Sequence, residues 1–341
     1  MIPLNADQTP RQGASTSLSV SKFDSSDSTG VDTARFLYRL SEMPNHLFLT
    51  GPRQRFPVLC DGTGELLNSG LNYGPTQLAS GPGLWVEGRP DQLFNGKGHD
   101  ELLPLNRFVE ADELVRENLG RLGVKLAGRR KTEVARIDTT AAIEMENPMS
   151  IQATLRALGA SSVPLRRTAT YKDKAGNVET LYFVGQNSKK LYERIYPEGP
   201  KHGPGREKFL RFEAQNRYDA RTRLPVQEWT ADRAQETFAK RFGAHRERVS
   251  EVIVGNADVI STELVRLYEE GEITRSAATR LAGYLLHRRN GNHKKLLASS
   301  SISRYEAELR RINLDLDEEC GEPLRLDLRH LFERTNALSW S

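Results

Sequence analysis

The sequence has little cysteine, no long apolar run and no strong excess of charge of either sign. Its two cysteines, Cys60 and Cys320, lie far apart without metal-type spacing, so we expect neither a disulfide framework nor a cysteine zinc site. No apolar stretch approaches the ~18 residues of a membrane span, and the N-terminus lacks the apolar core of a signal peptide. We therefore expect a soluble, cytoplasmic protein with no membrane partner.

The charges are nearly balanced, so their distribution carries more information than their sum. The 341 residues include 49 basic and 45 acidic side chains, for a net charge of +4. Basic residues gather at 129–131, 166–167, 189–190 and 288–295. One such cluster is typical of any solvated surface, but their recurrence favours a polyanionic partner.

The chain divides by composition into three parts. Residues 1–33 are rich in Ser, Thr, Asp and Gly and poor in large apolar residues, which predicts a disordered tail. Residues 34–225 mix strand and helix patterns, and residues 226–341 predict helices, among them 257–270, 274–289, 303–314 and 327–337. The predicted fold class is therefore α+β: a mixed-strand sheet with helices on one face, followed by an all-helical, helix-turn-helix or winged-helix-like domain.

Two predicted strands each present an acid on a polar face. In "VARIDTTAAIEM" this acid is Asp138, and in "FLRFEAQNR" it is Glu213. Each acid follows an arginine by two residues, Arg136 or Arg211, so each pair shares one strand face. Two carboxylates on a sheet suit a hard cation such as Mg²⁺. The alternative is two surface ion pairs that contribute little.

The segment "TLYFVGQNSKKLYERIYPEG", residues 180–199, places tyrosines among cations. A phenol, with a pKa near ~10, is a poor nucleophile at neutral pH without help from a cation or base. Lys189, Lys190 and Arg194 lie close in sequence to Tyr196 and would bind a phosphate. The alternative is that the tyrosines are half-buried packing residues.

These three segments, in this order, resemble the motifs of the filamentous-phage gene II replication initiators and of related plasmid rolling-circle initiators. By that resemblance Tyr196 matches the nicking tyrosine, with Tyr192 as the alternative nucleophile. Asp138 and Glu213 match the acidic pair that holds Mg²⁺ or Mn²⁺. The sequence departs from the pattern at Glu198, where a basic residue is common; Lys201 is a substitute candidate.

Two further segments resemble the same family. "GLWVEGRPDQLFNGKGHD" resembles the phage proteins' upstream segment, with Asp100 where Asn is usual, and "SISRYEAELRRINLDLDEECG" is more loosely similar. The sequence has no His-apolar-His metal motif. His99 is the one well-placed histidine, and the alternative is a loop histidine without a role.

The helical part carries a pattern typical of a DNA reader. Two helices joined by a basic, glycine-containing loop resemble a helix-turn-helix or winged arrangement, and a plain helical bundle is the alternative. The DNA-binding candidates across the chain are Lys189, Arg211, Arg288, Arg289, Lys294, Lys295, Arg304, Arg310 and Arg311.

The resemblance implies an enzyme that nicks one strand at an origin through Tyr196, with Lys190 and Arg194 assisting, and later religates it. Its partners would be origin DNA, a host helicase and a host polymerase, with a second copy of the chain in a homodimer as a further candidate. One alternative is a DNA-binding replication regulator without catalysis. A less favoured alternative is a tyrosine recombinase, because "HRER" (residues 245–248) fits that class's His-x-x-Arg pattern.

Overall fold

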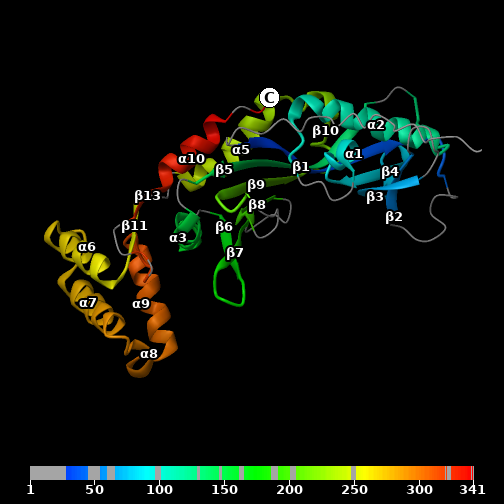
Figure 1. Cartoon of the computed structure of the whole chain (residues 1–341). Helices are drawn as coiled ribbons and strands as arrows, with labels where there is room; N and C mark the ends of the chain where they lie inside the picture. The colour runs from blue at the N-terminus through cyan, green and yellow to red at the C-terminus, as the bar shows by residue number, and fades with distance from the viewer. Residues whose placement is uncertain are drawn as a thin grey trace, which may run out of the picture.

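The computed structural model describes most of the chain from Ser28 onward (Figure 1). The described residues are 28–44, 54–59, 66–96, 101–128, 131–145, 148–160, 165–185, 191–199, 205–246, 251–318, 320, 324–338 and 340.

A ten-stranded sheet forms the centre of the molecule. Its strands run in the order β2-β3-β4-β1-β5-β9-β8-β7-β6, with β10 beside β5, and every pairing is antiparallel. The strands are β1 (Ser28–Arg39), β2 (Gln54–Leu59), β3 (Leu66–Leu78), β4 (Gly81–Gly88), β5 (Glu133–Glu144), β6 (Arg166–Lys172), β7 (Val178–Gly185), β8 (Leu191–Pro197), β9 (Phe209–Arg217) and β10 (Leu224–Pro225).

The alternation of side chains gives this sheet a polar face and an apolar face. Thr140 of β5 lies opposite Glu213 of β9 in register, and Asp138 lies opposite Gln215, so these side chains share the polar face. The intervening residues, such as Ile137 and Phe212, share the apolar face and are fully buried. The predicted alternation of both strands is thereby confirmed.

Helices cover the apolar face because aromatic side chains of the sheet pack against them. The helices α2 (Phe108–Arg121), α5 (Ala231–Arg246) and α10 (Leu328–Ala337) lie above the sheet in Figure 1. Phe212 meets Phe242 of α5 and Phe332 of α10, with ring centroids 5.6 and 5.7 Å apart. Helix α3 (Pro148–Ala160) packs against β7, and the short α1 (Gln92–Asn95), η2 (Leu105–Arg107) and η3 (Val226–Glu228) complete this part.

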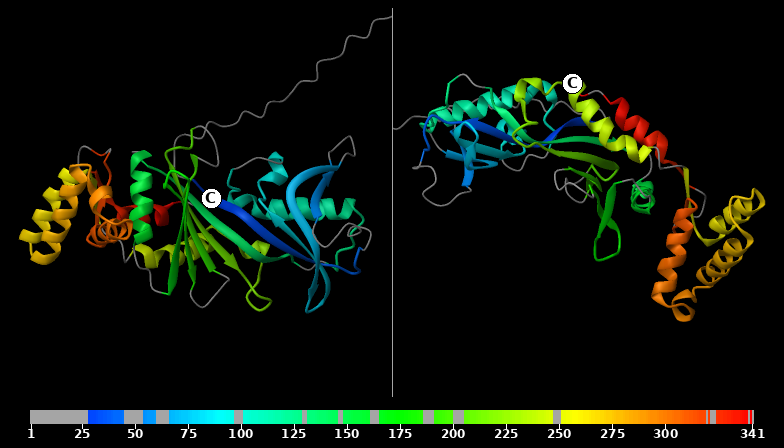
Figure 2. Two further views of the ribbon diagram at one scale, coloured as in Figure 1. Left: turned by 90° about the horizontal axis from the view of Figure 1, so that it is seen from below. Right: turned by 180° about the vertical axis from the view of Figure 1, so that it is seen from behind.

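The chain between α5 and α10 forms an arm that extends away from the large sheet, as both views of Figure 2 show. The arm has its own buried core, with members such as Ile260, Leu281 and Leu309. Its elements are β11 (Glu251–Gly255), α6 (Ala257–Glu269), α7 (Arg275–Arg289), α8 (His293–Leu296), α9 (Ser299–Arg311), β12 (Leu314–Leu316) and β13 (Leu324–Asp327). β11 pairs in parallel with β12 and antiparallel with β13.

The α+β class is confirmed, with corrections to its parts. The region after residue 225 is not wholly helical, because it contains three strands of three to five residues, too short to show an alternating pattern. The predicted domain boundary at residue 225 does not separate two cores, because α5 and α10, which follow it in the chain, pack into the buried core of the large sheet. The predicted tail ends too late: Ser28–Arg39 is a strand, and residues 1–27 lie outside the described residues. No helix in the described part of the chain is long and apolar enough to cross a membrane.

Candidate active site

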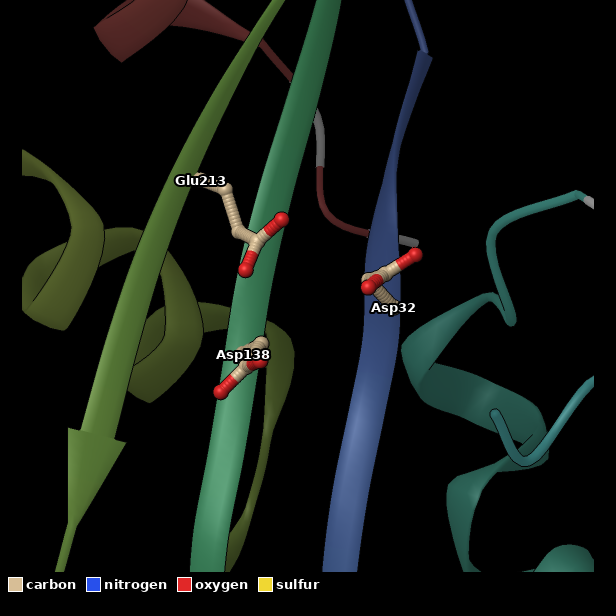
Figure 3. Close-up of side chains that lie close together, drawn as sticks. All are labelled: Asp32, Asp138 and Glu213. Carbon is tan, nitrogen blue, oxygen red and sulfur yellow. The ribbon is translucent and has the colours of Figure 1, made fainter. Parts of the chain in front are cut away.

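Three carboxylates from three adjacent strands converge on the polar face, as Figure 3 shows. They belong to Asp32 of β1, Asp138 of β5 and Glu213 of β9, and one oxygen of each lies within 4.8 Å of the others. All three residues are buried, at 8%, 0% and 0% exposure. The sequence pointed to Asp138 and Glu213 as a pair, and the fold adds Asp32 as a third member.

A β-bulge lies at Asp32. Val31 lies opposite Thr139 and Thr33 lies opposite Asp138, so Asp32 is an extra residue in β1 with no partner in β5. Asp32 is two residues beyond Gly30, which lies opposite Thr140, so alternation from Gly30 places Asp32 on the polar face. The bulge leaves Asp32 unpaired there and puts Thr33 opposite Asp138. Next to it, Gly30 permits close contact: an added Cβ would lie 2.6 Å from the Leu103 carbonyl oxygen.

Each carboxylate is paired with an arginine of the same face. Arg136 donates to Asp138 at 2.9 Å, as its i, i+2 spacing predicts. Arg211 does not pair with Glu213, as its own spacing suggested, but with Asp32. Glu213 instead accepts from Arg194 of β8, which lies directly opposite it in register.

Arg211 is a buried structural cation, which corrects its predicted role in contacting DNA. Its side chain is 1% exposed and bridges Asp32 and Glu198, with the second contact at 3.2 Å. Glu198 is buried too and also pairs with Arg206. Glu198, which stands where the initiator motif commonly has a basic residue, is therefore neutralised by Arg206 and Arg211.

The electrostatic environment differs among the acids. Burial raises the pKa of Asp138, and the nearby charge of Asp32 adds to this effect against the lowering influence of Arg136. Burial acts in the same direction on Asp32, but Arg211 and Arg89 outweigh it and lower the pKa of that carboxyl. The cluster is thus held together by cations, without which its like charges would repel one another.

Tyr196 lies beside this cluster. Its hydroxyl donates to the Glu213 carboxylate at 3.4 Å, and the guanidinium carbons of Arg211 and Arg194 lie 5.9 and 6.0 Å from its ring centroid. The residue is 5% exposed. Burial raises the pKa of Tyr196 to about 12, although both arginines act to lower it.

Tyr192, the alternative nucleophile, is the more accessible of the two tyrosines. It lies opposite Gln215 on the polar face and is half-buried, with the Arg217 guanidinium 5.9 Å from its ring centroid. Gln215 in turn donates to Asp138 at 3.3 Å. Both tyrosines therefore share a face with the acids, and it is Tyr196 whose hydroxyl contacts one of them.

The oxygen atoms gathered here fit a hard divalent cation. Mg²⁺ and Mn²⁺ prefer carboxylate ligands. Three carboxylates here each offer an oxygen, and these oxygens lie within 4.8 Å of one another. Thr140, which lies opposite Glu213, adds a buried hydroxyl with no hydrogen-bond partner among the described residues. The donor set is therefore entirely oxygen, as such a cation requires.

The remaining predicted residues fall into two groups. Lys189, Lys190, Lys201, His99 and Asp100 lie outside the described residues. The others lie on the arm. There, Arg288 pairs with Glu318 at 2.9 Å, Arg289 with Asp258 at 3.1 Å and Arg310 with Asp315 at 3.5 Å. The exposed cations of the arm include Lys294, Lys295, Arg304 and Arg311.

The recombinase alternative finds no support in the position of His245. This histidine is fully buried, and its ring packs edge-on against Phe183 at 4.4 Å. It lies with α5 on the apolar side of the sheet, whereas both tyrosines lie on the polar side. Arg248, the other end of the motif, is outside the described residues.

Comparisons with known proteins leave the family open. No protein-family model matches the chain, and no curated protein matches it. A rolling-circle replication initiator protein from Geobacillus stearothermophilus is similar over 57% of this chain and 76% of its own, with 15% identity and a TM-score of 0.33. Methanococcus jannaschii TBP is similar over 62% and 98%, with 7% identity and a TM-score of 0.24. Similarities this low carry no argument about function.

Proposed function

We propose that this protein is a metal-dependent DNA nickase and ligase that initiates rolling-circle replication. The observation that carries the proposal is the 3.4 Å contact between the Tyr196 hydroxyl and Glu213, one of three carboxylates gathered on the polar face. A nucleophile, a base and a set of cation ligands are the parts that phosphoryl transfer to a tyrosine requires.

The proposed reaction exchanges one phosphodiester bond for another. The Tyr196 oxygen attacks a backbone phosphorus, forming a 5′-phosphotyrosine, while the bond to the 3′ oxygen breaks and that oxygen takes a proton from the solvent and leaves as a hydroxyl. Glu213 accepts the phenol proton, and Arg194 and Arg211 stabilise the phenolate. A bound Mg²⁺ or Mn²⁺ would add positive charge next to the phosphate. Attack by the 3′ hydroxyl on the phosphotyrosine reverses the step and reseals the strand.

The proposed function implies several partner molecules. Origin DNA would be the substrate, and a host helicase and polymerase would extend the 3′ hydroxyl. Lys190 would assist Arg194 at the phosphate. A homodimer and a cytoplasmic location stay predictions from the sequence.

The burial of Tyr196 favours one second candidate function. A tyrosine that is 5% exposed, and whose pKa is raised by burial to about 12, suits a packing role. A replication regulator on this fold would bind the origin without cleaving it.

A plasmid assay separates the two candidates. The full chain is incubated with a supercoiled plasmid that carries its gene and flanking DNA, in Mg²⁺ or in EDTA. We expect open circles in Mg²⁺ and none in EDTA. Asp138→Asn and Glu213→Gln should each reduce the yield of open circles at least about 100-fold. Glu117→Gln, an exposed acid of α2, is the matched control. Binding to this plasmid without nicking in any variant would establish the regulator instead.

A further inference from the structure

A cavity on the polar face lies next to the acidic cluster. Its volume is about 290 Å³. It is lined by strands β1, β3, β4, β5 and β9 and by the loop after β9. Its charged and aromatic lining includes Arg35, Trp85, Arg136, Arg217, Tyr218 and Arg223. We call it the Trp85 cavity.

The lining combines positive charge with flat aromatic surface. Four of its residues are arginines, against one acid, Asp219, whose carboxylate accepts from the hydroxyl of Thr222 in its own loop. The Arg35 guanidinium carbon lies 5.2 Å from the Trp85 ring centroid, and both groups are partly exposed. Tryptophan rings and guanidinium planes are the surfaces on which unpaired bases stack, while arginines bind phosphates.

One arginine connects the cavity to the acidic cluster. Arg136 lines the cavity and also donates to Asp138 and, at 2.7 Å, to Glu87. Arg35 donates to the same Glu87 at 2.8 Å. A nucleotide in the cavity would therefore neighbour a phosphate held at the acids.

We propose that the Trp85 cavity binds one unpaired nucleotide of the strand that is nicked, with its base stacked on Trp85 and its phosphates held by the arginines. The identification of the strand as DNA rests on the proposed function. The base must be unpaired, because in a duplex its two faces are already covered by its neighbours.

Tryptophan fluorescence tests this proposal directly. The chain has three tryptophans, and Trp229 and Trp340 are 3% and 2% exposed, so quenching by a stacked base reports on Trp85. The full chain in EDTA is titrated with a single-stranded oligothymidylate, with an abasic oligonucleotide of equal length and with a duplex. We expect quenching with the oligothymidylate and little with the other two.

Variants separate stacking from structural damage. Trp85→Leu should bind the fluorescently labelled oligothymidylate roughly 5- to 150-fold more weakly in anisotropy, whereas Trp85→Phe should retain most of the affinity. Trp340→Phe should keep the quenching. Arg35→Gln should lower the slope of log affinity against log salt by about 0.7. Equal quenching by the abasic strand, or unchanged binding by a folded Trp85→Leu, would overturn the proposal.

A parallel nicking assay tells failure of this site from failure of the proposed function. If the protein nicks its plasmid and Trp85→Leu changes neither quenching nor affinity, the Trp85 cavity is not a nucleotide site and the nickase stands. If quenching depends on Trp85 but no variant or metal gives nicking, the nucleotide site stands and the nickase does not.

Discussion

At the scale of single residues, the acidic cluster balances repulsion against neutralisation. Three buried carboxylates lie within 4.8 Å of one another, and an arginine faces each of them. Ion pairs of this kind offset the cost of burial only when every charge has a partner. A divalent cation at the carboxylates would supply that neutralisation from a single centre.

We predict that Mg²⁺ raises the melting temperature of the protein and that Asp32→Asn removes this effect. A ligand that binds the folded state alone stabilises it by about 2.7 kcal/mol at a concentration 100 times its Kd. Thermal unfolding with and without Mg²⁺ measures the shift.

Glu117→Gln should respond to Mg²⁺ like the unmodified protein, because its site is remote from the acids. An equal Mg²⁺ response in Asp32→Asn would show that the third carboxylate is not a ligand. Asp32→Asn also leaves Arg211 with one buried partner, so each shift is compared with that variant's own metal-free melting temperature.

The residues of the site differ in how well the sequence identifies them. Asp138 and Glu213 lie in long alternating segments, so period-2 reasoning places both on one face. Asp32 follows a stretch of Ser, Asp and Gly that is typical of disorder, and its strand is buried only by neighbours distant in sequence. The bulge shifts the register of β1 at this residue, which alternation cannot predict.

At the scale of elements, strand β8 makes ion pairs on both faces of the sheet. Arg194 and Tyr196 lie on the polar face, whereas Glu193 points to the apolar face and is fully buried. There Glu193 accepts from Arg166 at 2.8 Å and lies 3.9 Å from His245 of α5. This buried charge cluster holds the strand that carries the proposed nucleophile.

Glu193→Gln should destabilise the protein in a pH-dependent way. Burial acts to raise the pKa of Glu193, but His245 and Arg166 outweigh it and lower that pKa below its usual 4.5. The carboxylate therefore stabilises the fold above pH 4.5, and this contribution is lost as the pH falls through the lowered pKa. We expect a loss of about 3 kcal/mol at pH 7.

Denaturant unfolding from pH 7 down to pH 3 measures this difference. The difference in unfolding free energy should shrink as the pH falls, because protonation of Glu193 removes the charge that distinguishes it from glutamine. A difference that stays constant with pH would mean that the glutamine harms packing rather than charge pairing.

The elements were predictable where local signals are strong. The helices predicted at 257–270 and 274–289 occur as α6 and α7, and Asn256 and Thr274 cap them through side-chain oxygens. The strands of the arm were missed because β12 and β13 have three and four residues. Such short strands form by pairing with β11, which is a tertiary interaction.

At the scale of the whole molecule, the arm is inserted between two helices that pack on the sheet. Its small sheet is tied to α3 by Arg156, which donates to Asp315 at 2.6 Å and to Asp317 at 3.0 Å. Lys294 and Lys295 belong to α8, which lies at the far end of the arm (Figure 1), whereas Arg304 and Arg311 belong to α9. The length of the arm therefore separates the two exposed lysines from the acidic cluster.

We predict that the double variant Lys294→Gln and Lys295→Gln weakens duplex binding but leaves nicking of a single-stranded origin oligonucleotide unchanged. Each lost phosphate contact should reduce the slope of log affinity against log salt by about 0.9. Lys240→Gln, an exposed lysine of α5, is the control. An unchanged salt slope in the double variant would exclude these lysines from the interface.

The most direct test of the central claim is the mass of the protein–DNA adduct after SDS treatment and protease digestion. The full chain reacts with its own origin DNA in Mg²⁺, and Tyr196→Phe and Tyr192→Phe react alongside. We predict a nucleotide-bearing peptide that contains Tyr196 and that persists in Tyr192→Phe but is absent from Tyr196→Phe. An adduct on Tyr192, or an adduct that survives Tyr196→Phe, would contradict the assignment of Tyr196 as the nucleophile.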